Sequence, residues 1–173
     1  YAFRVVTGGI LSVDATAEAL IEGSLNTTGG YGYGLHILNC SFKKNINALE
    51  EDTLKLMYDA QQTVFRNHAL IVAGKGNDAT SSKNTPSYSL KSYEVLSVGG
   101  SDTTGNKHPN SDYGNGMDVI APHSPEMIVT TGNNSDTEHT SFSGTSAATA
   151  HAAGVAGLML SYINDQTTTP NNL

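Results

Sequence analysis

The chain has no tryptophan and a single cysteine, Cys40, among its 173 residues. One cysteine excludes an intramolecular disulfide, so the fold must rest on a packed core, which a chain of this length can build as one domain. Cys40 lies in an apolar segment, where we expect an inert core thiol rather than a reactive one.

Basic residues are also scarce. Nine Lys and Arg stand against sixteen Asp and Glu, which gives a formal net charge of −7. There is no basic cluster, so nucleic acid is not an expected partner. No apolar run approaches the roughly 20 residues needed to cross a bilayer, and no signal-peptide pattern opens the chain. The composition predicts a mildly acidic, soluble protein with no membrane partner.

Strand and helix patterns alternate along the chain, which is typical of a parallel sheet covered on both faces. We therefore predict a three-layer, mostly parallel α/β fold. Helices are expected at 13–25 and 48–68, and polar surface loops at 102–112 and 131–139. Strands are expected at 3–6, around Ile37, at 70–73 and at 95–98. In the second helix the inward-facing side chains should be Leu49, Leu54, Met57, Ala60, Val64 and Phe65.

The segment Gly144-Thr145-Ser146 runs directly into a stretch of small residues with helical character. A serine at a helix N-terminus lies among unpaired backbone N–H groups and the positive end of the helix dipole. Both favour the negative charge that develops in acyl transfer. The alternative is that Ser146 only caps a buried helix, since Ser is a preferred N-cap residue.

The sequence from Gly144 to Gly154 resembles the serine motif of the subtilisin-like serine peptidases (subtilases, peptidase family S8), Gly-Thr-Ser-Met-Ala-Ala-Pro-His-Val-Ala-Gly. The departures Ala147, Thr149 and Ala150 remove no reacting group, and the usual proline lies in the first turns, where its missing N–H matters little. The resemblance implies that Ser146 is the nucleophile. It also implies that His151 is a packing residue and not the catalytic histidine.

An apolar run from Ala69 to Ala73 leads into Gly74-Lys75-Gly76-Asn77-Asp78. Taken alone, it predicts a buried strand followed by a turn. It also resembles the subtilase segment whose asparagine completes the oxyanion hole, a role that suits an amide because it donates a hydrogen bond without changing charge. We therefore assign Asn77 and the backbone N–H of Ser146 as oxyanion donors. The resemblance places the substrate beside Gly74, Lys75, Gly76, Asp78 and Thr145.

The segment Leu35–Phe42 resembles the subtilase strand Val-Ile-Asn-x-Ser-Leu-Gly, after which the backbone pairs with extended substrate and walls the S1 pocket. Ser41, Phe42 and Lys43 are accordingly predicted to bind substrate. Lys43 and Lys44 stand where the family usually has glycines, so the substrate preference should differ from that of the family. Two further core segments, at 93–100 and 116–122, match in the family's order.

A serine nucleophile needs a hydrogen-bonded base that is oriented by a carboxylate. In subtilases the aspartate and histidine motifs come before the serine. The chain has no Asp-Ser-Gly or Asp-Thr-Gly strand end and no His-Gly-Thr-His helix start, and residues 1–6 resemble the strand after the histidine helix. We therefore expect residues 1–173 to be the C-terminal part of a catalytic domain, truncated at both ends and inactive alone. A companion N-terminal segment and a peptide or protein are its expected partners.

Local residues offer weaker substitutes for the missing groups. His139 precedes Ser146 by seven residues, but a lone loop histidine is usually solvated surface. His36 lies in an apolar strand and is expected in the core. Asp78 is expected to line the S1 pocket or to cap a turn.

No cofactor motif is present. Calcium is common in the family, and the loops 106–118 and 133–138 carry oxygen ligands, but turn chemistry explains the same composition and no EF-hand spacing occurs. The resemblance implies secretion. A non-catalytic module derived from a subtilase is the alternative, although the presence of both Ser146 and Asn77 disfavours it. An unrelated α/β-hydrolase lacks support because Ala148 breaks the Gly-x-Ser-x-Gly pattern.

Overall fold

The computed structural model describes residues 2, 6–7, 10–25, 32–81, 83–89, 93–132 and 134–168. Within them, four strands form the central sheet in the order β3-β5-β7-β8, and every neighbouring pair is parallel. The predicted parallel sheet is thus confirmed. Its strands are β3 (Ile37–Cys40), β5 (Leu70–Gly74), β7 (Val95–Ser101) and β8 (Val119–Pro122).

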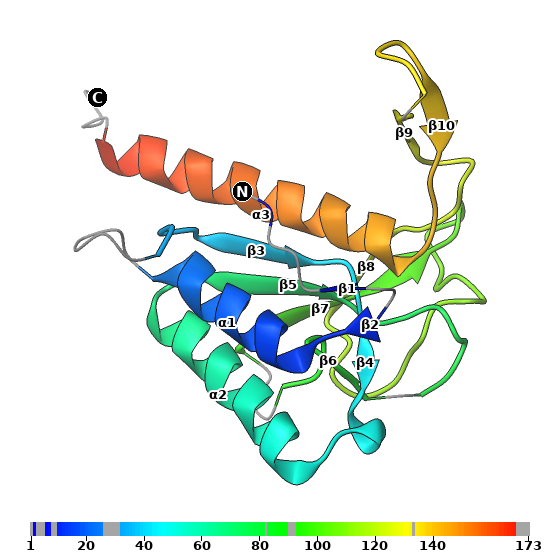
Figure 1. Cartoon of the computed structure of the whole chain (residues 1–173). Coiled ribbons are helices and arrows are strands. Elements are labelled where there is room, and N and C mark those ends of the chain that lie inside the picture. The colour runs from blue at the N-terminus through cyan, green and yellow to red at the C-terminus, as the bar shows by residue number, and fades with distance from the viewer. Residues whose placement is uncertain are drawn as a thin grey trace.

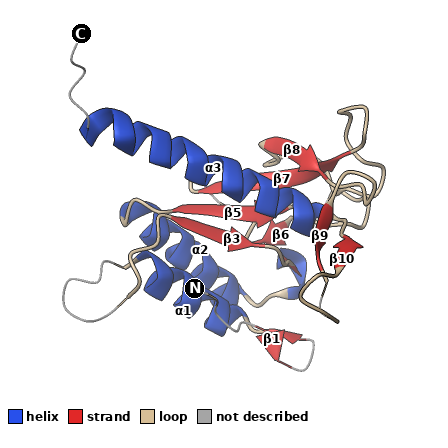
Figure 2. Cartoon of the chain, turned by 90° about the horizontal axis from the view of Figure 1, so that it is seen from above, coloured by secondary structure: helices blue, strands red, loops and turns tan. Residues whose placement is uncertain are grey.

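Helices cover both faces of this sheet, as predicted (Figures 1 and 2). Helices α1 (Val13–Ser24) and α2 (Glu51–Arg66) pack against each other and lie on one face. Helix α3 (Thr145–Thr168) crosses the other face and contacts all four strands. The result is the three-layer α/β arrangement.

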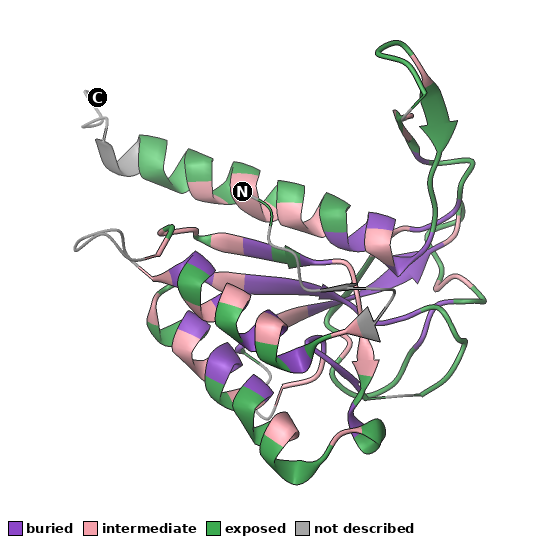
Figure 3. Ribbon diagram, viewed as in Figure 1, coloured by how far each residue is buried: buried purple, intermediate pink, exposed green. Residues whose placement is uncertain are grey.

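Each strand supplies both layers of the core because successive side chains of a strand point to opposite faces. In β5, Ile71 and Ala73 belong to the cluster under α1 and α2, whereas Val72 packs with Val98 and Ala148 under α3. All of these side chains are buried, and Figure 3 shows the middle of the sheet as mostly buried. A strand buried on both faces has to be continuously apolar, which is what the sequence from Ile71 to Ala73 shows.

The two helices of the first layer follow the predicted pattern with shifted ends. The hydroxyl of Ser12 caps α1 by accepting a hydrogen bond from the Ala15 N–H at 3.2 Å. Helix α2 begins at Glu51, after a short 3₁₀ turn (η1, Ile46–Ala48), and not at residue 48. The prediction that Phe65 faces inward is wrong. The Phe65 ring is exposed and contacts Tyr93, with 5.0 Å between the ring centroids, whereas Val64, also predicted to face inward, is fully buried.

Short antiparallel pairs complete the fold. Strand β1 (Val6–Thr7) pairs with β2 (Ile10–Leu11), and residues 3–5 of the predicted first strand lie outside the described residues. Strand β4 (Lys44–Asn45) pairs with β6 (Asn84–Thr85). The predicted loop 131–139 is flanked by β9 (Val129–Thr131) and β10 (His139–Ser141), which form a hairpin that projects from the body (Figure 1).

Two further expectations from the sequence are wrong. His36 precedes β3 and is exposed, so it is not a core residue. The segment 102–112 is not wholly a surface loop, because Ser111 and Asp112 are completely buried at its end. Both errors have the same cause. The residue types next to a position do not show whether a distant segment packs over that position in the fold.

One face of α3 carries exposed apolar side chains, namely Val155, Leu158, Met159, Tyr162 and Ile163. No helix in the described part of the chain is long and apolar enough to cross a membrane.

We expect Met57→Ala to lower the free energy of unfolding by about 2–5 kcal/mol, because Met57 is fully buried and its truncation leaves a cavity. Leu158→Ala removes a similar apolar volume from a side chain that is 73% exposed. It should change the free energy of unfolding by about 0.5 kcal/mol or less. Urea denaturation of both variants measures the difference. Similar losses in the two variants would contradict the assigned core.

Candidate active site

The carboxyl ends of β3 and β5 meet the N-terminus of α3. Ser146 is the second residue of α3, and its Oγ donates a hydrogen bond to the Ser41 carbonyl at 3.0 Å. In return, Ser41 Oγ donates to the Ser146 carbonyl at 3.0 Å. This reciprocal pair fixes the start of α3 against the segment that follows β3.

A second pair of hydrogen bonds fixes the turn after β5 to the same helix end. The backbone N–H of Thr145 donates to Asn77 Oδ1 at 2.8 Å, and the Gly76 N–H donates to Thr145 Oγ1 at 3.2 Å. Because Oδ1 is used as an acceptor, the Nδ2 group of Asn77 is left as a donor beside the turn. It lies 3.2 Å from where a Cβ of Gly144 would be, and Gly144 has a φ of +97° that favours glycine.

These contacts create an environment suited to a developing negative charge. The first N–H groups of a helix, including that of Ser146, have no acceptor within the helix, and the helix dipole adds positive potential there. The exposed Asn77 amide supplies a further donor. Two neutral donors next to a serine hydroxyl are the arrangement that stabilises a tetrahedral oxyanion.

A polar pocket of about 170 Å³ opens at this point. It brings together eight of the ten predicted site residues, from three separate segments of the chain. They are Ser41, Phe42, Lys43, Gly74, Gly76, Asn77, Thr145 and Ser146.

The other two predicted site residues do not line the pocket. The Lys75 side chain is buried, and its Nζ donates to the Asn115 carbonyl at 3.0 Å. Burial lowers the pKa of Lys75, although Asp112 and Asp118 act in the opposite direction. Lys75 is therefore a buried structural cation. Asp78 is exposed, and its carboxylate pairs with Lys43 at the pocket rim.

Asp112 is a site residue that the sequence did not indicate. Its fully buried carboxylate accepts hydrogen bonds from the backbone N–H of Asp78 at 2.9 Å and from that of Thr80 at 3.0 Å. It also accepts from Lys43 Nζ at 3.0 Å and from Asn84 Nδ2 at 3.2 Å. Burial alone would raise the pKa of Asp112, but the hydrogen bonds from Thr80, Lys43 and Asp78 and the charge of Lys43 hold it below its ordinary value. A charged Asp112 thereby holds the loop that carries Asn77.

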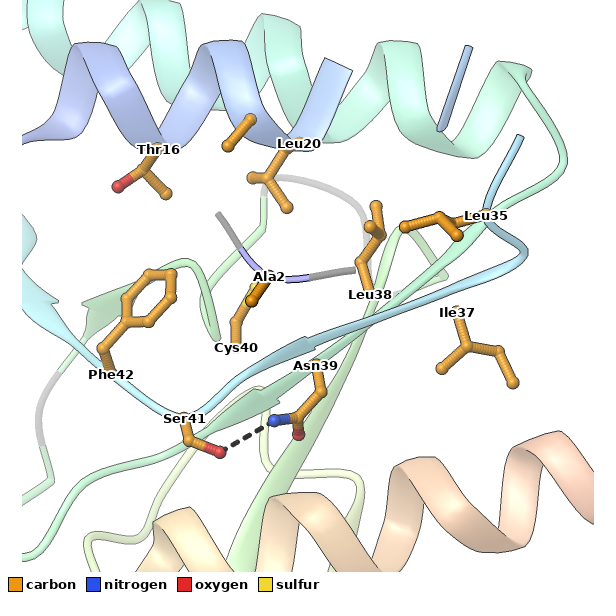
Figure 4. A pocket seen from close by; sticks show the side chains of 11 residues that line it. Ala2, Thr16, Leu20, Leu35, Ile37, Leu38, Asn39, Cys40, Ser41 and Phe42 are labelled. Atoms are coloured by element: carbon orange, nitrogen blue, oxygen red, sulfur yellow. Dashed lines mark hydrogen bonds between the residues drawn. The ribbon is translucent and has the colours of Figure 1, made fainter. Parts of the chain in front are cut away.

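On the β3 side, Asn39 plays a supporting part that the sequence did not indicate either. Its Nδ2 donates to Ser41 Oγ at 3.0 Å, which orients the hydroxyl that holds Ser146 (Figure 4). A larger cavity of about 470 Å³ lies between β3 and α1 and shares Ser41 and Phe42 with the polar pocket. Cys40 lines that cavity as well. Cys40 is buried in the core, as expected, and burial raises the pKa of its thiol to about 12.

All six histidines fall in the described residues, and none of them hydrogen-bonds to Ser146 Oγ. The exposed His139 ring is bonded to the Thr137 carbonyl within its hairpin. His151 is also exposed and contacts the Ala147 carbonyl, so the structure gives it no buried packing role. His108 and His123 stack on each other, with ring centroids 3.9 Å apart.

The acidic loops use their carboxylates for local hydrogen bonds. Asp102 accepts from Thr104 and Asn106, and Glu138 accepts from Asn134. Across the ranges given above, no three His, Cys, Asp or Glu side chains lie together in a way that could hold a metal ion. Residue 133 of the proposed calcium loops lies outside the described residues.

The model of the subtilase family matches residues 10–173. The chain belongs to the subtilase family. Among its relatives, M-protease of Shouchella clausii is 30% identical over 160 residues, covering 92% of this chain and 37% of that protein. Thermitase of Thermoactinomyces vulgaris is 41% identical over 93 residues, covering 54% of this chain and 31% of that protein. This subtilase chain thus spans about a third of the length of these relatives.

Solved structures agree with the fold. A prenylagaramide maturation protease, PagA, superposes with a TM-score of 0.75 at 26% identity, covering 97% of this chain and 56% of that one. A lanthipeptide protease superposes with a TM-score of 0.78, covering 97% of this chain and 57% of that one, at 18% identity, which shows the fold alone. The expected subtilisin-like fold is confirmed.

We expect Gly76→Ala to destabilise this subtilase by roughly 3 kcal/mol or more. Gly76 has a φ of +125°, and an added Cβ would lie 2.1 Å from Asp112 Oδ2. Gly105→Ala is the matched control, because Gly105 has a φ of +83° with open space around it and should cost only about 1 kcal/mol. Thermal unfolding of both variants measures the difference. An equal loss of stability in Gly76→Ala and Gly105→Ala would show that the clash with Asp112 has no effect.

We expect Asp112→Asn to lower the free energy of unfolding at neutral pH by roughly 2 kcal/mol, because the charged acceptor of a buried network is lost. The folded-state pKa of Asp112 lies below its ordinary value of 3.8. Its contribution is therefore complete above that value and disappears as the pH falls through the folded-state pKa. Denaturation curves from pH 7 down to pH 2 should converge for the variant and the unmodified chain.

Asp59→Asn is the control for this measurement. It breaks the exposed Lys55–Asp59 pair and should leave the free energy of unfolding at neutral pH almost unchanged. A loss for Asp112→Asn that stayed constant down to pH 2 would argue against its charged state.

Proposed function

We propose that this chain supplies the nucleophile and the oxyanion hole of a serine endopeptidase that cleaves peptide bonds through an acyl-enzyme on Ser146. The observation that carries the proposal is the hydrogen bond from the Thr145 N–H to Asn77 Oδ1. It orients the Asn77 amide so that its NH₂ group is a donor at the helix end where Ser146 begins. A capping serine in a purely structural helix has no need of such a donor.

In the proposed reaction, Ser146 Oγ attacks the carbonyl carbon of the scissile bond and loses its proton to a histidine base. The carbonyl oxygen becomes an oxyanion, which the Asn77 amide and the Ser146 N–H stabilise. The amine then leaves with the proton from the base, and water hydrolyses the ester. Before attack, Oγ has to exchange its hydrogen bond to the Ser41 carbonyl for one to the base.

The base and its carboxylate are proposed to lie outside this chain, in a companion N-terminal segment of the same domain. Two observations support this. The described histidines do not bond to Ser146, and the chain covers only about a third of the curated relatives reported above. We accordingly expect the chain alone to be inactive toward peptides.

The substrate is proposed to be an extended peptide. The segment from Ser41 to Lys43 follows β3 at the pocket edge, where substrate backbone could pair with it. Its Lys43 and Lys44 side chains replace the family's usual glycines and are proposed to narrow substrate choice. Secretion is proposed from the family membership, and no cofactor is proposed for the reaction.

The proposal is tested by assaying the chain together with the segment that carries the aspartate and histidine motifs, as a fused or a separate polypeptide. Ser146→Ala should abolish peptide hydrolysis. Asn77→Ala should lower kcat by about 10²- to 10³-fold, the loss known for the corresponding donor in subtilisin, with little effect on KM. Thr104→Ala, in an exposed turn, should leave both constants unchanged.

Two results would overturn the proposal. One is full peptidase activity from this chain without the companion segment, which would place the base within residues 1–173. The other is unchanged turnover in Ser146→Ala, which would remove the acyl-enzyme from the mechanism.

A further inference from the structure

Lys43 links two carboxylates at the pocket beside Ser146. Its Nζ is 3.0 Å from Asp112 Oδ2 and also contacts Asp78 Oδ2. The Asp112 carboxylate is completely buried, the Asp78 side chain is 65% exposed, and that of Lys43 is 28% exposed. The ammonium group therefore lies between the pocket interior and its rim.

The Lys43 side chain separates the pocket from the buried Asp112 carboxylate. Lys43 and Gly76 both line the pocket, whereas Asp112 does not. At Gly76, an added Cβ would meet Asp112 Oδ2 at 2.1 Å, Lys43 Nζ at 2.6 Å and Lys43 Cδ at 2.8 Å. The carboxylate and the lysine thus lie directly against the glycine that forms the pocket wall.

Charge balance explains why a cation occupies this position. The Lys43 ammonium is already paired with both carboxylates, so a negatively charged substrate side chain would lie beside Asp78 and Asp112 and be repelled by them. A positively charged substrate side chain could not pair with Asp78 and Asp112 either, because both carboxylates already pair with Lys43. Only an uncharged side chain avoids both penalties, and the pocket volume of about 170 Å³ favours a small one.

We propose that Lys43 sets the charge selectivity of this pocket, because its ammonium group occupies the position that a basic substrate side chain would take. With Lys43 present, the pocket accepts small uncharged side chains before the scissile bond. Without the Lys43 side chain, Asp112 and Asp78 form a receptor for an ammonium group. This inference rests on the proposed peptidase function for its biological meaning, but the receptor itself can be tested by binding alone.

The first test uses Lys43→Ala in a Ser146→Ala background, with n-propylammonium as the probe. This ion matches the Cγ-to-Nζ atoms that the substitution deletes. We expect it to bind Lys43→Ala at least tenfold more tightly than the chain that retains Lys43, with NMR shifts at the Gly76 and Asp112 amides. Uncharged n-propanol should not bind, and Lys43→Arg, which keeps a cation, should behave like Lys43.

Further variants separate this role from a purely structural one. Adding Asp112→Asn to Lys43→Ala should abolish the binding of n-propylammonium. If Lys43 only ties the two loops together, Lys43→Ala will lower Tm and n-propylammonium will neither bind nor restore it, which would overturn the proposal. If Lys43→Ala folds poorly, a rise in Tm with n-propylammonium but not with n-propanol remains the expected result.

The second test uses the assembled peptidase with Ser146 intact. The ratio of kcat/KM for a peptide with Lys before the scissile bond to that for the matched Ala peptide should rise at least tenfold in Lys43→Ala. Lys43→Arg should leave the ratio unchanged. Failure of the proposed function would abolish hydrolysis of both peptides without affecting the binding result, so the two failures can be told apart. An unchanged ratio in an active Lys43→Ala enzyme would refute the selectivity role.

Discussion

The hydrogen bond between the Thr145 N–H and Asn77 Oδ1 is the contact on which the site depends. It joins residues 68 positions apart, at the end of a buried strand and at the start of α3. Without it, the amide could rotate and present its carbonyl oxygen to the pocket, which would repel an oxyanion. The buried strand β5 fixes where the turn that carries Asn77 begins. The sheet therefore determines the position of the oxyanion donor.

Charged side chains hold the loops around this contact in place. Asp112 anchors the loop that follows Asn77 through two backbone N–H groups, and Lys43 connects the same carboxylate to the segment after β3. Charge-assisted hydrogen bonds of this kind are stronger than neutral ones, and they resist rearrangement when they are buried. Charged hydrogen bonds thus hold this loop in addition to apolar packing.

The sequence predicted the parts of the structure that depend on local pattern. The apolar run before Gly74 and the small residues after Ser146 indicated the strand, the helix and the two motifs. Local pattern did not predict the burial or exposure of three residues, Asp112, Lys75 and His36. The environment of each of these residues depends on segments that are distant in the chain. The burial of Asp112 and Lys75 and the exposure of His36 therefore leave no periodic signal in the sequence. Motif spacing also could not show that Lys43 spans two carboxylates.

Cys40 lies one residue before Ser41, buried in β3 and with a raised pKa. A thiol in that state reacts with alkylating reagents only when its strand opens, because both access and ionisation are blocked in the closed form. The only thiol in the chain is thus a built-in reporter of local opening at the edge of the active site. Its labelling rate therefore reports every opening of β3, in local openings as well as in global unfolding.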